Sequence, residues 1–258
     1  MNKYFLSTIL FSCFINIDRF QSGPTQFQLM QTTERKIIKE PSSDSTGEEI
    51  WKIKHSKDFI ITGDGSAANW NNADWLSLPL RSGKGVNYQT KIKMLYTDSG
   101  LYCLYYCEDN KIIATLKEDF SDFWNEDVVE AFFWPDERLP LYLEYELSPL
   151  NYELPILVPN IKGKFFGWRP WHYEGIRRTK HATHVIKDRN TVTAWTAEFF
   201  IPYALLTPIP NVPPQKGSRW RANFYRIDHD MGEATWQLQE VRNVNFHDYE
   251  KFGTIEFD

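Results

Sequence analysis

Apolar and polar residues alternate along most of the chain beyond residue 50, with the period of two that is typical of β-strands. Many apolar positions are β-branched or aromatic, and Gly or Pro residues separate the alternating runs. Only Tyr203–Leu206 looks helical, and only briefly. This pattern predicts an all-β fold, an antiparallel, jelly-roll-like β-sandwich with long loops and little helix. The expected strands cover residues 90–96, 101–107, 128–134, 141–147, 181–187, 191–202, 219–228, 234–238 and 252–257.

Some segments depart from this alternation. The spacing of residues 67–75 suggests a short helical turn, whereas residues 149–163 are rich in Pro, Asn and Gly and are predicted to form a loop. The segment that follows mixes aromatic side chains, Trp171 among them, with arginines. Aromatic rings beside hydrogen-bond donors can build a sugar-binding site, and they can equally seal a long loop against a sheet. Both interpretations stay open, and Trp171 is a candidate ligand-binding residue.

A carboxylate lies inside the apolar strand predicted at residues 128–134. Alternation places Glu130 on the same face as Phe132 and Trp134. An isolated ionised carboxylate is costly to bury, so Glu130 needs hydrogen-bond donors, water or a ligand. Two hypotheses follow: Glu130 pairs with an internal arginine, or it lies at the rim of a binding site with Trp124 beside it as a flat platform.

The cysteines do not suggest a disulfide or a metal site. Cys103 and Cys107 lie on one predicted strand, where their Cα atoms would be roughly 13 Å apart, beyond disulfide reach. They share a face with Leu101 and Tyr105, so we expect them to be buried apolar thiols. The remaining Cys13 either leaves with an export signal or carries a lipid.

The beginning of the chain resembles an export signal. A short basic start precedes an apolar stretch at residues 4–17, which is shorter than a membrane span and suits a signal peptide. Residues 1–20 are therefore predicted to be a signal peptide, with lipidation of Cys13 as the alternative and the only expected link to a membrane. Residues 21–50 are predicted to be a linker or extended arm, and residues 51–258 the folded domain. The expected location is periplasmic, cell-surface or extracellular.

Composition narrows the range of partners. Of the 258 residues, 42% are hydrophobic, enough for a sizeable core, and 16% are aromatic, which suits both a sandwich core and packing against sugar faces. The net charge is −5, so nucleic acid is not an expected partner. Acidic residues gather between residues 108 and 122, where they could be solvated loop charges or calcium ligands, although their spacing is not that of an EF-hand.

A series of short motifs resembles the carbohydrate-binding module family 9-like domains. The central motif is Trp124-Asn125-Glu126-Asp127-Val128-Val129-Glu130-Ala131-Phe132, and the resemblance extends over most of residues 59–258. The other motifs occur in the family's order at residues 60–65, 70–75, 95–102, 195–202, 220–226 and 246–253.

The resemblance implies a β-sandwich in which two aromatic rings hold one sugar ring and polar groups surround its edge. By position, Trp124 matches the first aromatic residue and Glu130 the carboxylate. The second aromatic residue, a Trp in the family, is Phe246 here, and Asn243 matches the amide that precedes it. A family arginine on the strand after Glu130 falls at about Glu146, which reverses the charge.

The chemistry of the residues supports the same function. Sugar C–H faces pack on aromatic rings, and hydroxyl groups need planar, bidentate partners. Arg226 could be such a partner and joins Trp171 as an additional ligand-binding candidate. We therefore predict non-catalytic carbohydrate binding by an exported module, in support of polysaccharide catabolism. No cofactor is expected, and calcium stays open.

Two alternative functions are kept. A glycoside hydrolase uses two carboxylates about 5 to 9.5 Å apart, and a haem-binding sandwich needs axial ligands. The candidate carboxylates are Asp127, Glu130, Glu144 and Glu146, unless Arg219, Arg221 and Arg226 neutralise them in structural pairs. The candidate haem ligands are Met231, His172, His181, His184, His229 and His247.

Overall fold

The computed structural model describes residues 50–165 and 172–258, and every structural statement below concerns these residues. The predicted signal peptide, residues 21–49 of the predicted linker, and Trp171 lie outside the described residues.

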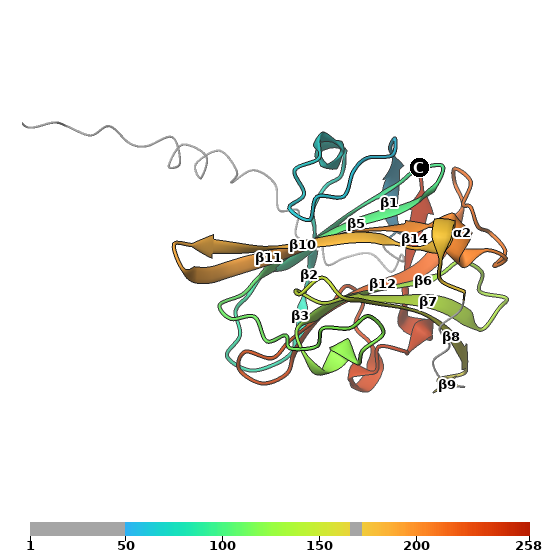
Figure 1. Ribbon diagram of the computed structural model, residues 1–258. Helices are drawn as coiled ribbons and strands as arrows, with labels where there is room; N and C mark the ends of the chain where they lie inside the picture. Colours follow the sequence, from blue (N-terminus) through green and yellow to red (C-terminus); the bar gives the residue numbers. More distant parts are fainter. Residues whose placement is uncertain (1–49, 166–171) are drawn as a thin grey trace, which may run out of the picture. The chain divides into compact units, whose positions relative to one another are not determined.

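The strands form two sheets, which Figure 1 shows as two layers. The first sheet has the order β10 (Lys180–Asp188), β11 (Thr191–Pro202), β5 (Gly100–Glu108) and β4 (Thr90–Tyr96), with the short β2 (Leu76–Leu78) beside β4. The second sheet has the order β14 (Gly253–Phe257), β12 (Arg219–Asp228), β6 (Val128–Trp134), β7 (Leu141–Leu147), β8 (Glu153–Ile161) and β9 (Lys164–Phe165). The strand β13 (Ala234–Gln237) pairs with β12 and with β3 (Leu80–Ser82).

The strand β1 (Ile50–His55) joins the two sheets. Its first residues pair in parallel with β14, and Lys54 and His55 pair in parallel with β4. The other pairs of named strands are antiparallel. The prediction of an all-β sandwich with little helix is confirmed. Among the described residues the structure has a single short α-helix, α2 (Tyr203–Leu206), at the position predicted from the sequence.

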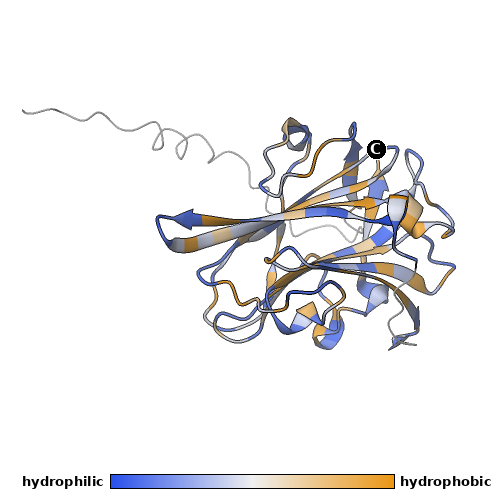
Figure 2. Ribbon diagram, viewed as in Figure 1, coloured by the Kyte–Doolittle hydropathy of each residue, from blue (hydrophilic) through white to orange (hydrophobic). Residues whose placement is uncertain are grey.

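The main core lies between the sheets, where alternate residues of each strand meet. On β5 the inward row includes Tyr105 and both cysteines, and on β6 it includes Phe133. Cys103 and Cys107 are fully buried free thiols, which confirms their predicted role as apolar core residues. Burial raises the pKa of the Cys107 thiol to about 12. Figure 2 shows hydrophobic residues along the strands and hydrophilic residues at the tip of the β10–β11 hairpin.

The loop predicted at residues 149–163 is wrong, because β8 occupies most of it. Leu154, Ile156 and Val158 are buried at alternate positions, as expected of a strand. The prolines of this segment suggested a break, but β8 pairs with β7 on one side and with only the two residues of β9 on the other. A strand near a sheet edge can accept proline because fewer of its N–H groups are needed for pairing.

Each sheet is covered on its outer side by loops. The segment 56–75, which contains the predicted turn as the 3₁₀ helix η1 (Ala68–Asn72), packs Phe59 and Trp70 against Tyr102 and Phe200 of the first sheet. The outer face of the second sheet is covered by two loops, residues 109–127 and 238–252, whose short helical turns lie below β6 and β7 in Figure 1. Among the described residues, no helix has the length and apolar character needed to cross a membrane.

Candidate functional site

The outer face of the second sheet carries three glutamates on adjacent strands. Glu130 of β6 lies directly opposite Glu146 of β7, and Tyr225 of β12 lies opposite Glu130 on the other side. Glu144 is on the same face of β7, two residues before Glu146, and lies opposite Phe132. Register and alternation therefore bring Glu130, Glu144 and Glu146 together, and we call them the glutamate cluster.

The glutamate cluster is buried without a compensating charge. Glu130 and Glu144 are 2% exposed and Glu146 is fully buried. Apart from the contact between the Glu144 and Glu146 carboxyls themselves, both oxygens of Glu146 and Oε2 of Glu144 have no hydrogen-bond partner among the described residues. Burial raises the pKa of all three carboxyls well above their usual range, and repulsion between neighbouring carboxylates raises it further.

The hypothesis that Glu130 pairs with an internal arginine is wrong for the arginines considered. Arg219 pairs with Glu256, and Arg221 lies 3.6 Å from Glu137. None of the three members of the glutamate cluster forms an ion pair with an arginine or lysine in the described part of the chain.

Two aromatic candidates come from the loops over this face. Trp124 is in the turn η2 (Phe123–Asn125), which the fully buried Phe123 anchors, and Trp124 itself is half-buried. Phe246 is 8% exposed and stacks on Tyr225, with ring centres 4.1 Å apart and an interplanar angle of 10°. The Tyr225 hydroxyl also donates a hydrogen bond to the Phe246 carbonyl at 2.9 Å. Both rings thus belong to the apolar cluster above the second sheet.

Asn243 lies at an exposed bend of the second loop. Its φ of 55° is in the left-handed region that Asn tolerates better than most residues. The side chain of Arg242 holds this bend by pairing with Asp248 and Glu250. Asn243 also lines a surface pocket of about 460 Å³ together with Tyr249 and other residues of the loop.

His247, a candidate haem ligand in the sequence, lies at this face of the structure. Its Nδ1 is 2.7 Å from the Tyr142 hydroxyl and 3.9 Å from a carboxyl oxygen of Glu144. Asn160 donates a hydrogen bond to the His247 carbonyl at 2.9 Å. Burial lowers the pKa of His247 to about 4, so the ring is neutral at pH 7 and does not balance the glutamates.

Arg226 does not belong to this face. Alternation along β12 turns it to the side opposite Tyr225, and it is fully buried there. Its Nη2 lies 3.1 Å from Asp109 and 2.6 Å from Asp228, and its guanidinium lies over Trp236 at 4.7 Å. The placement of Arg226 as a partner of a ligand on the outer face is therefore corrected to a structural ion pair.

The same region contains the described residues that come nearest to a cation site. Carboxyl oxygens of Asp109, Asp127 and Asp228 all lie within 4.8 Å of one another. Burial raises the pKa of Asp109 to about 6 and that of Asp127 to about 7. Asp127 accepts hydrogen bonds from the backbone N–H groups of Ile113 and His229, while Arg226 supplies the positive charge. This group is the candidate for the calcium site that the sequence left open. The guanidinium of Arg226 already occupies part of it.

This arrangement also separates the carboxylates of the hydrolase hypothesis. Asp127 belongs to the group around Arg226, whereas Glu130, Glu144 and Glu146 are together on the outer face.

The aromatic surroundings of the glutamate cluster, Phe132 and Tyr225, were not recognised as site residues from the sequence. The sequence did contain a signal for them, because Phe132 and Tyr225 alternate with core residues along β6 and β12 and therefore lie on the outer face.

Comparison with known proteins adds evidence of family. The sequence model of the family described as carbohydrate family 9 binding domain-like matches residues 61–258. An extracellular protein of Arthroderma benhamiae is 29% identical over 143 residues, which cover 54% of this chain and 63% of that protein. This chain therefore matches less than two thirds of the length of that relative.

Solved structures share the fold. A carbohydrate binding module family 9 from Caldicellulosiruptor kristjanssonii, solved in complex with cellotriose, has a TM-score of 0.59 at 18% identity and covers 81% of this chain and 94% of its own. A Bacteroides uniformis structure described as a candidate carbohydrate-binding protein has a TM-score of 0.66 at 15% identity and covers 82% of this chain and 100% of its own. With the family match over residues 61–258, the chain belongs to the carbohydrate family 9 binding domain-like family.

Proposed function

We propose that this protein binds carbohydrate, without turning it over, at the outer face of the second sheet. The observation that carries the proposal is the glutamate cluster, whose unpartnered carboxyl oxygens lie in the same apolar layer as Trp124 and Phe246. A sugar ring needs a flat apolar surface for its C–H faces and hydrogen-bond acceptors for its hydroxyl groups. This face supplies both, and the related module from Caldicellulosiruptor kristjanssonii was solved with cellotriose.

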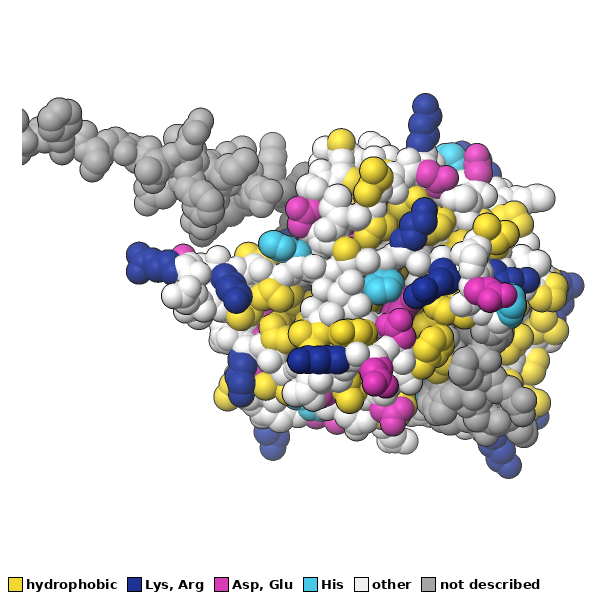
Figure 3. Space-filling view, in the orientation of Figure 1, with side chains coloured by type: hydrophobic (Ala, Val, Ile, Leu, Met, Phe, Trp, Pro, Cys, Tyr) yellow, Lys and Arg dark blue, Asp and Glu magenta, His cyan; other side chains and the backbone are white. Residues whose placement is uncertain are grey.

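The proposed cellular role is an exported protein that supports polysaccharide catabolism. The relative named an extracellular protein and the signal-like residues 1–20 favour export. The basic residues give no reason to propose a nucleic-acid partner, because Lys and Arg side chains are scattered among acidic ones on the face shown in Figure 3.

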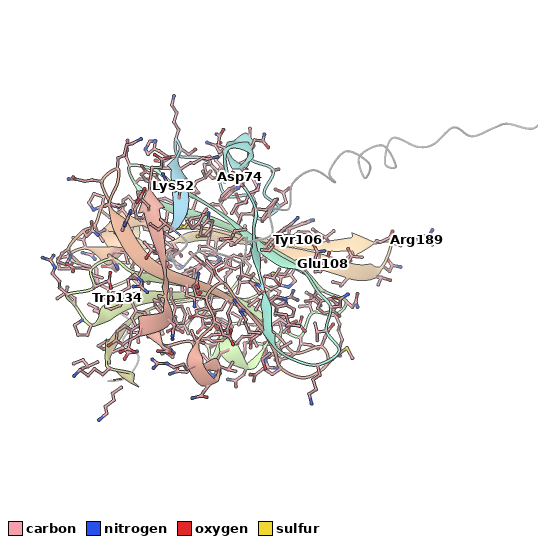
Figure 4. The ribbon with its side chains drawn as sticks, turned by 180° about the vertical axis from the view of Figure 1, so that it is seen from behind. Lys52, Asp74, Tyr106, Glu108, Trp134 and Arg189 are labelled. Carbon is pink, nitrogen blue, oxygen red and sulfur yellow. The ribbon has the colours of Figure 1, made fainter. Side chains whose placement is uncertain are left out.

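Binding should be tested with the full chain on a glycan array, followed by calorimetry with the best oligosaccharide. Trp124→Ala should weaken binding at least tenfold, because a stacking platform is worth on the order of 1–3 kcal/mol. Trp75→Ala is the matched control, since Trp75 is 38% exposed and packs beside Tyr106 of the first sheet. Figure 4 shows Tyr106 well apart from Trp134 of the second sheet.

Two results would count against the proposal. If no glycan binds, or if Trp124→Ala and Trp75→Ala bind alike, the outer face of the second sheet is not a sugar site. If the wild-type protein releases reducing ends from the bound oligosaccharide and Glu130→Gln stops the release, the protein is a hydrolase and the non-catalytic proposal fails.

A further inference from the structure

This protein satisfies its other buried glutamates completely. Glu198, on the outer side of the first sheet, accepts hydrogen bonds from the Thr62 and Gly63 N–H groups at 2.9 and 2.6 Å and from Trp70 Nε1 at 2.8 Å. Glu153 accepts a bond from Tyr145 at 2.8 Å and lies 3.4 Å from His181. Among the glutamates buried in the described residues, oxygens without a partner are therefore confined to the glutamate cluster, and they call for an explanation there.

No positive charge balances the glutamate cluster among the described residues. A carboxylate in a buried setting is stabilised by an opposite charge or by several donors. Here the nearest candidate cation, His247, is neutral at pH 7 because burial lowers its pKa to about 4. The arginines of the neighbouring strand β12 are engaged elsewhere, as described above.

The surroundings of the cluster favour an organic cation over a metal ion as this missing charge. Within the described residues, the group of three carboxylates whose oxygens converge within 4.8 Å is Asp109, Asp127 and Asp228. The glutamate cluster is not such a group. Its surroundings are also rich in aromatic rings, namely Phe132, Tyr142, Tyr225 and Phe246. Carboxylates combined with aromatic rings suit an organic ammonium group.

We propose that the ligand of this face is an amino sugar, a pyranose that carries a protonated amine, and that Glu130, Glu144 and Glu146 bind its ammonium group. This inference rests on the proposed function, because it names the class of sugar bound at the same face. An ammonium group has three N–H donors and no acceptor, and its positive charge favours release of the protons that the raised pKa values keep on these carboxyls in the free protein. The aromatic rings contact the C–H face of the sugar and attract the cation through their electron-rich faces.

Ligand entry requires movement of the covering loops. The glutamate cluster is between 0% and 2% exposed, so a sugar reaches it only when side chains above it move aside. Trp124 and Phe246 both come from loops rather than strands, and loops move more readily than a paired sheet. Binding should therefore change the fluorescence of Trp124, which Trp124→Phe would remove.

The test compares β-1,4-linked hexamers of glucosamine, N-acetylglucosamine and glucose, which differ only at C2 of each ring. Affinities are measured by calorimetry with the full chain at pH 6 and low salt, where most of the amines are protonated. We expect the glucosamine hexamer to bind at least about tenfold more tightly than either neutral hexamer, with an advantage that shrinks as salt is added. Glu146→Gln should remove that advantage, so that the three hexamers bind with affinities within about twofold of one another. Glu118→Gln, which removes an exposed charge outside the cluster, should change neither.

The outcomes separate the inference from the proposed function. If the glucose hexamer binds at the Trp124 site and the glucosamine hexamer binds no more tightly, the amino-sugar inference fails and carbohydrate binding stands. If none of the hexamers and no glycan on the array binds, both fail. If Ca²⁺ alone binds and Glu146→Gln abolishes this, the cluster is a metal site and the inference is overturned. Circular dichroism and thermal melting of Glu146→Gln establish that a loss of preference does not arise from unfolding.

Discussion

Replacing Glu146 by Gln should stabilise the protein by an amount that grows with pH. Glu146 is fully buried, and among the described residues its carboxyl oxygens have no hydrogen-bond partner other than the carboxyl of Glu144. Burial and the negative charge of Glu144 raise the pKa of Glu146 well above the ordinary value of 4.5 in the folded protein. Between these two pKa values the folded protein holds a proton that the unfolded chain has released. The stability contributed by the protonated group is fully present below pH 4.5 and is lost as pH rises.

The magnitude follows from this one proton. A group that is protonated only in the folded state lowers the free energy of unfolding by about 1.4 kcal/mol for each pH unit. Between pH 5.5 and 7.5 the wild type should therefore lose about 3 kcal/mol that Glu146→Gln keeps, provided that the folded pKa lies above this range. His247, whose pKa is lowered to about 4, acts in the opposite direction below pH 6.5, but it is present in both proteins and cancels from the difference.

Urea unfolding followed by tryptophan fluorescence at pH 5.5, 6.5 and 7.5 measures this difference. Glu118→Gln is the control, because its side chain is exposed and its difference from wild type should be independent of pH. If the difference between Glu146→Gln and wild type also stays constant within about 0.5 kcal/mol, Glu146 is ionised in the folded protein and the reasoning is refuted.

Three further predictions test other parts of the structure. Trp124→Ala should weaken sugar binding at least tenfold with a small change in melting temperature, whereas Phe123→Ala, beside it but fully buried, should lower the free energy of unfolding by about 3–5 kcal/mol; equal melting shifts would contradict this. Arg226→Met should cost about 3–5 kcal/mol in urea unfolding, because it leaves two buried aspartates without their cation; a neutral effect would refute the ion-pair role. Iodoacetamide at pH 8 should label Cys103 and Cys107 only in denaturant. If mass spectrometry shows that the two thiols are rapidly labelled in the native protein, their burial is disproved.

Most of the fold could be predicted from the sequence because each strand carries its own alternation. The expected bounds of β4, β6, β7, β11 and β12 agree with the structure. The prediction failed at β8, where Pro155 and Pro159 suggested a loop. A local pattern cannot reveal that a segment will lie near the edge of a sheet, where proline is tolerated.

The candidate site could be predicted only in part, because alternation defines a face and not the neighbouring strand. The sequence placed Glu130 on the face of Phe132, and the structure confirms this. It could not show that Glu146 lies directly opposite, since strand register depends on the whole sheet. The position of Arg226 could have been predicted, because alternation places it on the same face of β12 as Trp220 and Phe224, which lie in the core.

The contrast between Glu198 and Glu146 distinguishes a buried acid with a structural role from one that we propose to bind a ligand. Both are fully buried on outer sheet faces, and both are flanked by apolar strand residues, so their sequence settings are alike. Glu198 is surrounded by donors because the segment 62–70 wraps over it, whereas the loops above Glu146 bring aromatic rings to the cluster and no donor to its carboxyl group. A fold that needed Glu146 only for stability would be improved by Leu or Gln at this position. The presence of an acid there is explained if a ligand supplies the balancing charge, at the expense of stability in the free protein.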